Sequence, residues 1–154
     1  MAKKKYKEFK QGTYNPINPN KYKGSKPICY RSSWELAFFK YCDSNPSIIQ
    51  WGSESVVVPY VCPTDGNLHR YFVDFYIKVK QGDTVTKFLI EIKPKRQTQK
   101  PTPSPRKKQQ TLIKEQLAYI KNTAKWESAK TWANKNGYKF LILTEEELKK
   151  LNCM

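Results

Sequence analysis

The sequence predicts an α/β domain in which a central mixed β-sheet is flanked by helices. Three observations indicate this class: an amphipathic helical pattern beginning near residue 33, a strand–turn–strand pattern over residues 69–93, and helical segments followed by an apolar strand over residues 138–143. With 154 residues, the chain is long enough to bury a core within one domain.

The N-terminal segment is predicted to be a basic, irregular arm over residues 1–28, followed by a single domain over residues 29–154. The arm is rich in lysine and tyrosine and is interrupted by glycine and proline. Lysine and tyrosine together suit contacts to nucleic-acid backbone and bases. A solvated tail that aids solubility is an equally weighted alternative.

The first helix is predicted to begin at Ser32 or Ser33, because a serine N-cap precedes an apolar stripe at helical spacing. Asn45-Pro46 ends it. Glu35 lies beside the stripe in the first turn, where a carboxylate also interacts favourably with the helix dipole. The stripe consists of Trp34, Ala37, Phe38, Tyr41 and Cys42.

Four extended segments follow, over residues 48–51, 54–61, 69–79 and 84–93. The third and fourth form a meander that places Asp74 and Glu91 on neighbouring strands. Asp74 lies among aromatic residues on a strand buried on both sides, so its carboxylate requires a partner, a metal or a raised pKa. Glu91 and Lys93 are two residues apart and therefore share one face of their strand. The alternative to a buried site is that Glu91 and Lys93 lie on an edge strand and face water.

The C-terminal part is predicted to contain a proline-rich loop, two helices, a strand and a short last helix. The helices run from residue 107 onward and over about 124–136, with Gly137 ending the second. The last helix follows a capping box at residues 144–147. The apolar side of the first of these helices is formed by Leu112, Ile113, Gln116, Leu117 and Ile120.

Positive charge is concentrated in two segments. The chain has 29 Lys+Arg against 13 Asp+Glu, a net charge of +16. Residues 1–27 contain eight lysines and Glu8, and residues 94–121 contain eight basic residues and Glu115, so each segment carries +7. Such a distribution favours a polyanionic partner.

Composition argues against several other classes. The four cysteines form no C-x-x-C pair, and the one histidine is His69, so neither a zinc site nor a disulfide framework is indicated. A reduced intracellular setting is the simpler interpretation. No apolar run approaches the roughly 18 residues of a membrane span, and no apolar segment follows the basic N-terminus as in a signal peptide.

Three acids and a lysine make up the set of groups that divalent-metal nucleases use. Mg²⁺ prefers carboxylate, phosphate and water oxygens. It also stabilises charge on a phosphate under attack. The pattern Asp74…Glu91-Ile92-Lys93, with the two acids seventeen positions apart, resembles the P-D…(D/E)-x-K signature of the restriction-endonuclease-like superfamily. Val73 stands where that signature has proline.

A closer resemblance covers most of residues 30–145. These residues are similar to the TnsA-type transposon endonuclease domain and, with the basic arm and small size, to the head-completion nucleases of large tailed phages. The resemblance depends on the following blocks of sequence: Tyr30-Arg31-Ser32-Ser33-Trp34-Glu35, Val58-Pro59-Tyr60, Arg70-Tyr71-Phe72-Val73-Asp74-Phe75, Glu91-Ile92-Lys93-Pro94, Gly137-Tyr138-Lys139-Phe140 and, for the phage family, Asn122-x-x-Lys125-Trp126.

The resemblance implies a restriction-endonuclease-like core and a metal-dependent site. Asp74 and Glu91 would bind Mg²⁺, with Mn²⁺ as a substitute, Lys93 would be the catalytic lysine, and Glu35 would complete the site. Gln116 and His69 are expected to be structural or surface residues. The candidate DNA contacts are Arg31, Lys95, Arg96, Lys100, Arg106, Lys107 and Lys108. For Arg31 and Lys95, a plain surface charge is an equal alternative.

The predicted function is a Mg²⁺-dependent DNA endonuclease that cleaves or trims DNA at the filled phage head. The expected partners are DNA and phage head or portal proteins, without a membrane. The expected location is the host cytoplasm during assembly, or the virion. A non-catalytic DNA-binding head protein is the first alternative, and an RNA-binding protein with structural carboxylates is the second. The sequence indicates neither base specificity nor oligomeric state.

Overall fold

A four-stranded sheet with the order β3-β6-β7-β8 forms the centre of the computed structural model, which describes residues 11–153. Its strands β3, β6 and β7 are antiparallel, whereas β8 runs parallel to β7. The fold class predicted from sequence, a mixed sheet flanked by helices, is therefore confirmed. The four strands span Ile48–Ser53, Phe75–Gln81, Thr84–Ile92 and Tyr138–Leu143.

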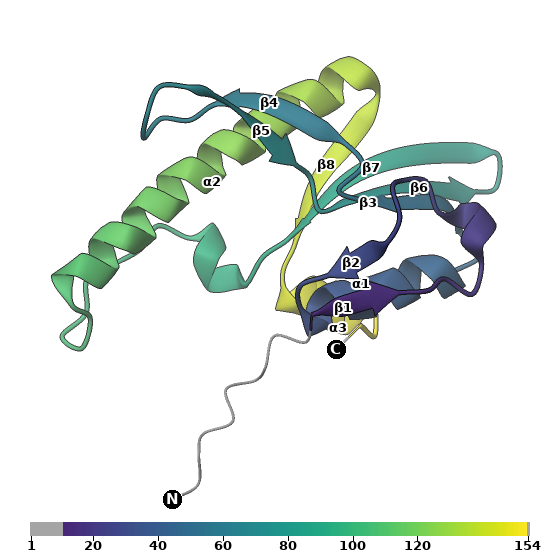
Figure 1. The fold of residues 1–154 in the computed structure, drawn as a ribbon, viewed down its shortest axis with the longest axis horizontal. Coiled ribbons are helices and arrows are strands. Elements are labelled where there is room, and N and C mark those ends of the chain that lie inside the picture. The colour runs from purple at the N-terminus through teal and green to yellow at the C-terminus, as the bar shows by residue number, and fades with distance from the viewer. Residues whose placement is uncertain (1–10, 154) are drawn as a thin grey trace, which may run out of the picture.

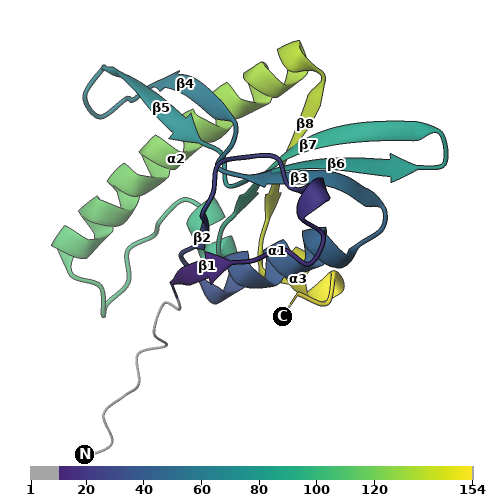
Figure 2. The same ribbon diagram turned by 45° about the vertical axis from the view of Figure 1, so that its right-hand side comes forward.

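Helices cover both faces of this sheet (Figures 1 and 2). Helices α1 (Ser33–Ser44) and α3 (Glu145–Lys150) lie on one side, and α2 (Gln109–Asn136) lies on the other. Each side has its own core. Phe38 and Phe39 of α1 pack with Ile90 of β7 on the first side, and Trp126 of α2 packs with Leu89 of β7 on the second. Successive residues of β7 therefore point into different cores.

The helix ends follow the capping chemistry that the sequence predicts. The Ser32 hydroxyl accepts a hydrogen bond from the Glu35 amide at 3.2 Å and begins α1. Thr144 and Glu147 form the reciprocal capping box of α3. Gly137 ends α2 with φ +76°, a left-handed conformation that glycine adopts without steric cost.

The two helices predicted after residue 107 are one continuous α2 of 28 residues. This prediction is wrong because residues 121–124 contain no glycine or proline to interrupt the helix. The predicted apolar side is also not a core face, since Ile113, Leu117 and Ile120 are 47%, 49% and 43% exposed. Among the described residues, no helix is both long and apolar enough to cross a membrane.

The strand predicted over residues 69–79 is two strands, β5 (Leu68–Phe72) and β6. Strand β5 leaves the central sheet and pairs with β4 (Val57–Val61) as a separate antiparallel hairpin. Figure 1 shows this hairpin lying across α2. The prediction that Asp74 lies within a strand is therefore wrong. Asp74 lies at the junction where the chain passes from the hairpin into the sheet.

The segment predicted to be irregular is packed over residues 11–28. Strands β1 (Gly12–Tyr14) and β2 (Ile28–Tyr30) pair around the short 3-10 helix η1 (Pro19–Lys21). Tyr22 is buried against Trp51, with ring centroids 4.8 Å apart. The sequence pattern did not show this because the packing depends on residues distant in the chain. The basic residues before residue 11 lie outside the described range.

Asp43, a buried carboxylate in α1, anchors this segment. It accepts hydrogen bonds from the Tyr14 hydroxyl at 2.6 Å, the Ile17 amide at 2.7 Å and the Asn18 amide at 2.9 Å. Burial opposes ionisation, but these three donors outweigh it and lower the Asp43 pKa. The lowered pKa contributes stability above the unfolded pKa of about 4, and this stability is lost as pH falls through the folded value.

We expect Asp43→Ala to destabilise the protein strongly. The substitution removes three hydrogen bonds to a charged acceptor and leaves donors unpaired, which costs about 3 kcal/mol and lowers Tm by roughly 6–12 °C at pH 7. Thermal unfolding measures this change. Asp83→Ala, at an exposed turn, is the control. A loss for Asp43→Ala no larger than the control's would contradict the anchoring role.

Candidate active site

Glu91 is the most buried acid of the predicted site. It lies near the end of β7 on the face toward α2 and is 5% exposed. The Tyr71 hydroxyl, from the neighbouring hairpin, donates to its Oε2. Lys93 follows directly after β7, and its ammonium lies 3.8 Å from the Glu91 Oε1. The edge-strand alternative is therefore wrong for this pair.

Asp74 is brought to Glu91 by the junction between β5 and β6. Its Oδ2 accepts a hydrogen bond from the Ile92 amide at 2.9 Å, which ties it to the residue after Glu91. Its backbone carbonyl accepts from the Glu54 amide at 3.1 Å. The antiparallel register of β6 and β7, with Phe75 opposite Ile90, places Asp74, just before β6, beside the end of β7 that carries Glu91.

The charge of Glu91 destabilises the ionised form of Asp74, whereas burial is the main cost to Glu91. Burial and the charge of Glu91 raise the pKa of Asp74 well above its usual range, against the Ile92 hydrogen bond. Burial also raises the pKa of Glu91, against the Tyr71 hydrogen bond and the positive charges of Lys93 and Lys125. Two acids held together at this cost are typical of a functional site rather than of a structural ion pair.

Glu35 approaches this pair from α1. Its Oε2 accepts a hydrogen bond from the Arg31 amide at 2.8 Å. Burial raises the Glu35 pKa, and its charge adds to the raised pKa of Asp74. The structure therefore brings all four predicted residues, Glu35, Asp74, Glu91 and Lys93, into one electrostatic cluster. The ligand atoms of the three acids are not all within 4.8 Å of one another among the described residues.

Three further residues, Tyr71, Lys125 and Glu54, lie in or beside the cluster, and the sequence patterns assign none of them a role. Lys125 of α2 has a pKa lowered by burial, partly offset by Glu91, and its ammonium lies 5.5 Å from the centre of the Tyr71 ring. Glu54 has φ +51° and pairs with the Arg31 guanidinium at 3.4 Å. Tyr71 and Lys125 occur in the sequence blocks of the resemblance, but only tertiary packing brings them to Glu91.

The predicted DNA contacts occupy different environments. Arg96, Lys100 and Lys107 line a groove of about 620 Å³ between the proline-rich loop and α2, which Lys114 also lines. Lys95 is held away from it by a 2.7 Å ion pair with Glu146 of α3. Gln116, Arg106, Lys108 and Arg31 are exposed. Three of the predicted contacts therefore converge on this groove.

The mixed sheet and the acids at its strand ends define a restriction-endonuclease-like α/β protein. A model of the family described as TnsA-like endonuclease N terminal matches residues 45–145, a range that includes Asp74, Glu91 and Lys93 but not Glu35. The chain belongs to this TnsA-like endonuclease family. It is also 44% identical over 144 residues to the head completion nuclease of Enterobacteria phage T4, covering 91% of this chain and 94% of that protein. No solved structure matches the chain.

Proposed function

We propose that this protein is a metal-dependent DNA endonuclease that acts in phage head completion, where it cleaves or trims DNA at the filled head. The observation that carries the proposal is the pairing of the half-buried Asp74 with the buried Glu91 beside Lys93, in a member of an endonuclease family. The relative named head completion nuclease supports the place of action. Head or portal proteins as partners, and the host cytoplasm during assembly as location, belong to the same proposal.

The acid pair fits a divalent cation. Carboxyls whose pKa values are raised by desolvation are poorly stabilised as anions by the protein alone, and a cation between them would remove that cost. The donors are all hard oxygens, which suits Mg²⁺ or Mn²⁺. We assign Asp74 and Glu91 as ligands and Glu35 as a third ligand or a holder of water. When bound, the cation supplies positive charge at the phosphate and acidifies water.

The remaining residues position groups around the acids. The Tyr71 hydroxyl fixes one Glu91 oxygen, so that Oε1 is directed toward Lys93. The Lys93 ammonium, 28% exposed, is accessible to a phosphate oxygen or an attacking water beside the acids. Lys125, on α2, adds a second positive charge near Glu91. These residues can therefore orient a nucleophile and stabilise the extra negative charge of phosphoryl transfer.

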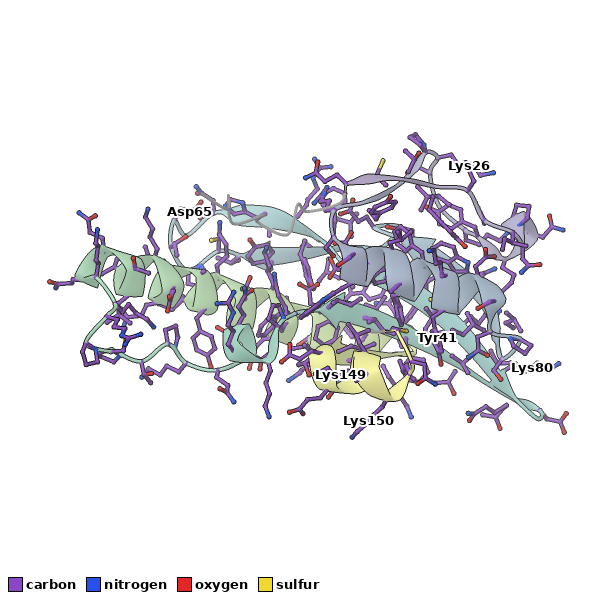
Figure 3. All side chains as sticks on the ribbon, turned by 90° about the horizontal axis from the view of Figure 1, so that it is seen from below. Lys26, Tyr41, Asp65, Lys80, Lys149 and Lys150 are labelled. Carbon is purple, nitrogen blue, oxygen red and sulfur yellow. The ribbon has the colours of Figure 1, made fainter. Side chains whose placement is uncertain are left out.

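DNA is expected to pass from this site along the groove beside α2. Arg96→Ala with Lys100→Ala should reduce affinity for duplex DNA and lower the slope of log K against log salt by about 2, because two phosphate contacts are lost. Filter binding at several salt concentrations measures this slope. The control is Lys149→Ala with Lys150→Ala, a pair in α3 labelled in Figure 3. Equal losses in both double variants would contradict a specific DNA path.

The test of the function is cleavage of supercoiled plasmid by purified protein with Mg²⁺, Mn²⁺ or EDTA. We expect nicked or linear product with either metal and none with EDTA. Tight, salt-sensitive binding without cleavage under any metal would instead support the non-catalytic head protein. Equal cleavage of RNA, or preferential binding to it, would favour the RNA alternative.

A further inference from the structure

A second cluster of possible metal ligands lies at the tip of the β4–β5 hairpin. The Cys62 sulfur, a carboxylate oxygen of Asp65 and a ring nitrogen of His69 all lie within 4.8 Å of one another. This is the one such group of three among the described residues. Figure 3 labels Asp65 at the end of the hairpin away from the central sheet.

The hairpin turn fixes the positions of these three side chains. The Cys62 carbonyl accepts hydrogen bonds from the amides of Asp65 and Gly66 at 3.3 and 2.7 Å, and the Cys62 amide donates to Asn67 at 2.9 Å. Gly66 has φ +72°, which this tight turn requires. His69 is opposite Tyr60 in the antiparallel register. The three donors thus converge through a short loop of defined conformation.

The present contacts are close to those of a metal site, but the His69–Asp65 pair would have to open to admit an ion. His69 Nε2 and Asp65 Oδ2 are 2.7 Å apart, and the Cys62 sulfur lies 3.0 Å from the Thr64 hydroxyl. In a tetrahedral zinc site with bonds of about 2.0–2.3 Å, donor atoms lie about 3.3–3.8 Å apart. Rotations of the exposed Asp65, the half-buried His69 and the buried Cys62 side chains would reach that arrangement, with the ion in place of the proton between Asp65 and His69.

We propose that Cys62, Asp65 and His69 bind a borderline-soft transition metal ion, with Zn²⁺ as the best match, and that water completes its coordination. One thiolate, one imidazole and one carboxylate form a donor set typical of Zn²⁺ and unsuited to Mg²⁺. The site is distinct from the acids of the proposed active site, all of whose donors are oxygen.

The hairpin gives such an ion a structural task. Two-stranded hairpins are marginally stable by themselves, and this hairpin has outward side chains such as Val61 and Leu68 that are 60% and 72% exposed. It also carries Tyr71, which holds Glu91. An ion at the tip would stabilise the pairing of β4 with β5 and so the position of the Tyr71 hydroxyl.

Cobalt titration of the full chain tests the proposal. Co²⁺ bound at this site should give a thiolate-to-cobalt charge-transfer band and the intense visible bands of tetrahedral cobalt, at one equivalent, and Zn²⁺ but not excess Mg²⁺ should remove them. Cys62→Ser should abolish the charge-transfer band, whereas Cys29→Ser, at an exposed cysteine, should retain it. His69→Gln, at a partly exposed side chain, should weaken Co²⁺ binding at least tenfold without loss of fold.

Thermal unfolding provides an independent readout. One equivalent of Zn²⁺ should raise Tm for the wild type and for Asp74→Asn, but not for Cys62→Ser or His69→Gln. Retention of the band and the Tm shift in Asp74→Asn separates this site from the proposed active site. Absence of a charge-transfer band, its persistence in Cys62→Ser, or its loss in Cys29→Ser would overturn the proposal.

Discussion

Asp74→Asn is expected to abolish cleavage and, at the same time, to stabilise the metal-free protein. Replacing the proposed carboxylate ligand by a neutral amide weakens its interaction with the metal, which should reduce the cleavage rate by at least about 1,000-fold. In EDTA at pH 7.5, replacing a carboxyl whose ionisation burial and Glu91 oppose should increase the free energy of unfolding by on the order of 1 kcal/mol, which raises Tm by about 2–4 °C. Plasmid cleavage and thermal unfolding measure the two effects.

The stability difference should depend on pH in a defined direction. Because the pKa of Asp74 is raised in the folded chain, the folded state binds more protons than the unfolded state above pH 4 or so. Metal-free wild type therefore loses stability as pH rises from about 4 toward the folded pKa. The advantage of Asp74→Asn should grow over the same range and be small at about pH 3. A variant that is less stable than wild type in EDTA at every pH would contradict this account.

Lys93→Ala is expected to reduce cleavage by about 100- to 10,000-fold while the protein still binds Mn²⁺. The ammonium is the positive group next to Glu91 Oε1 that is accessible to a substrate phosphate. Lys93→Arg should restore little activity, since the planar guanidinium differs in shape and direction from an ammonium. Single-turnover cleavage and isothermal titration with Mn²⁺ separate the loss of chemistry from the loss of metal binding.

Lys95→Ala is the matched control, because Lys95 is two residues away, is exposed and pairs with Glu146. It should change the cleavage rate by less than about threefold, as expected for removal of an exposed ion pair. Equal rate losses in Lys93→Ala and Lys95→Ala would indicate that both lysines contribute only surface charge and would contradict the assignment of Lys93.

Local patterns were sufficient to predict the elements that carry the acids. The strand–turn–strand pattern over residues 69–93 and the serine cap of α1 follow from short-range rules. They placed Glu35 in the first helix and Glu91 in the strand, as the structure has them, whereas Lys93 lies just past the end of that strand. The approach of Asp74 to Glu91 was also predictable, because antiparallel neighbours joined by a tight turn must bring their distal ends together.

The features that were not predicted depend on packing between distant segments. Nothing near Tyr14 or Tyr22 shows that one binds Asp43 and the other packs on Trp51. The break at Asp74 has no local signal either, because it arises where the hairpin turns away to cover α2. Sequence reasoning assigned His69 no chemistry for a different reason: the spacing of Cys62, Asp65 and His69 is not a standard metal-binding motif, and only the conformation of the turn brings the three side chains together.

The most direct test of the central claim is the location of Mn²⁺ by anomalous scattering from crystals of the protein soaked in the ion. The account predicts a peak between the carboxylates of Asp74 and Glu91, and no such peak in Asp74→Asn. A peak elsewhere in the wild type, or none between these acids at a Mn²⁺ concentration that supports cleavage, would contradict it.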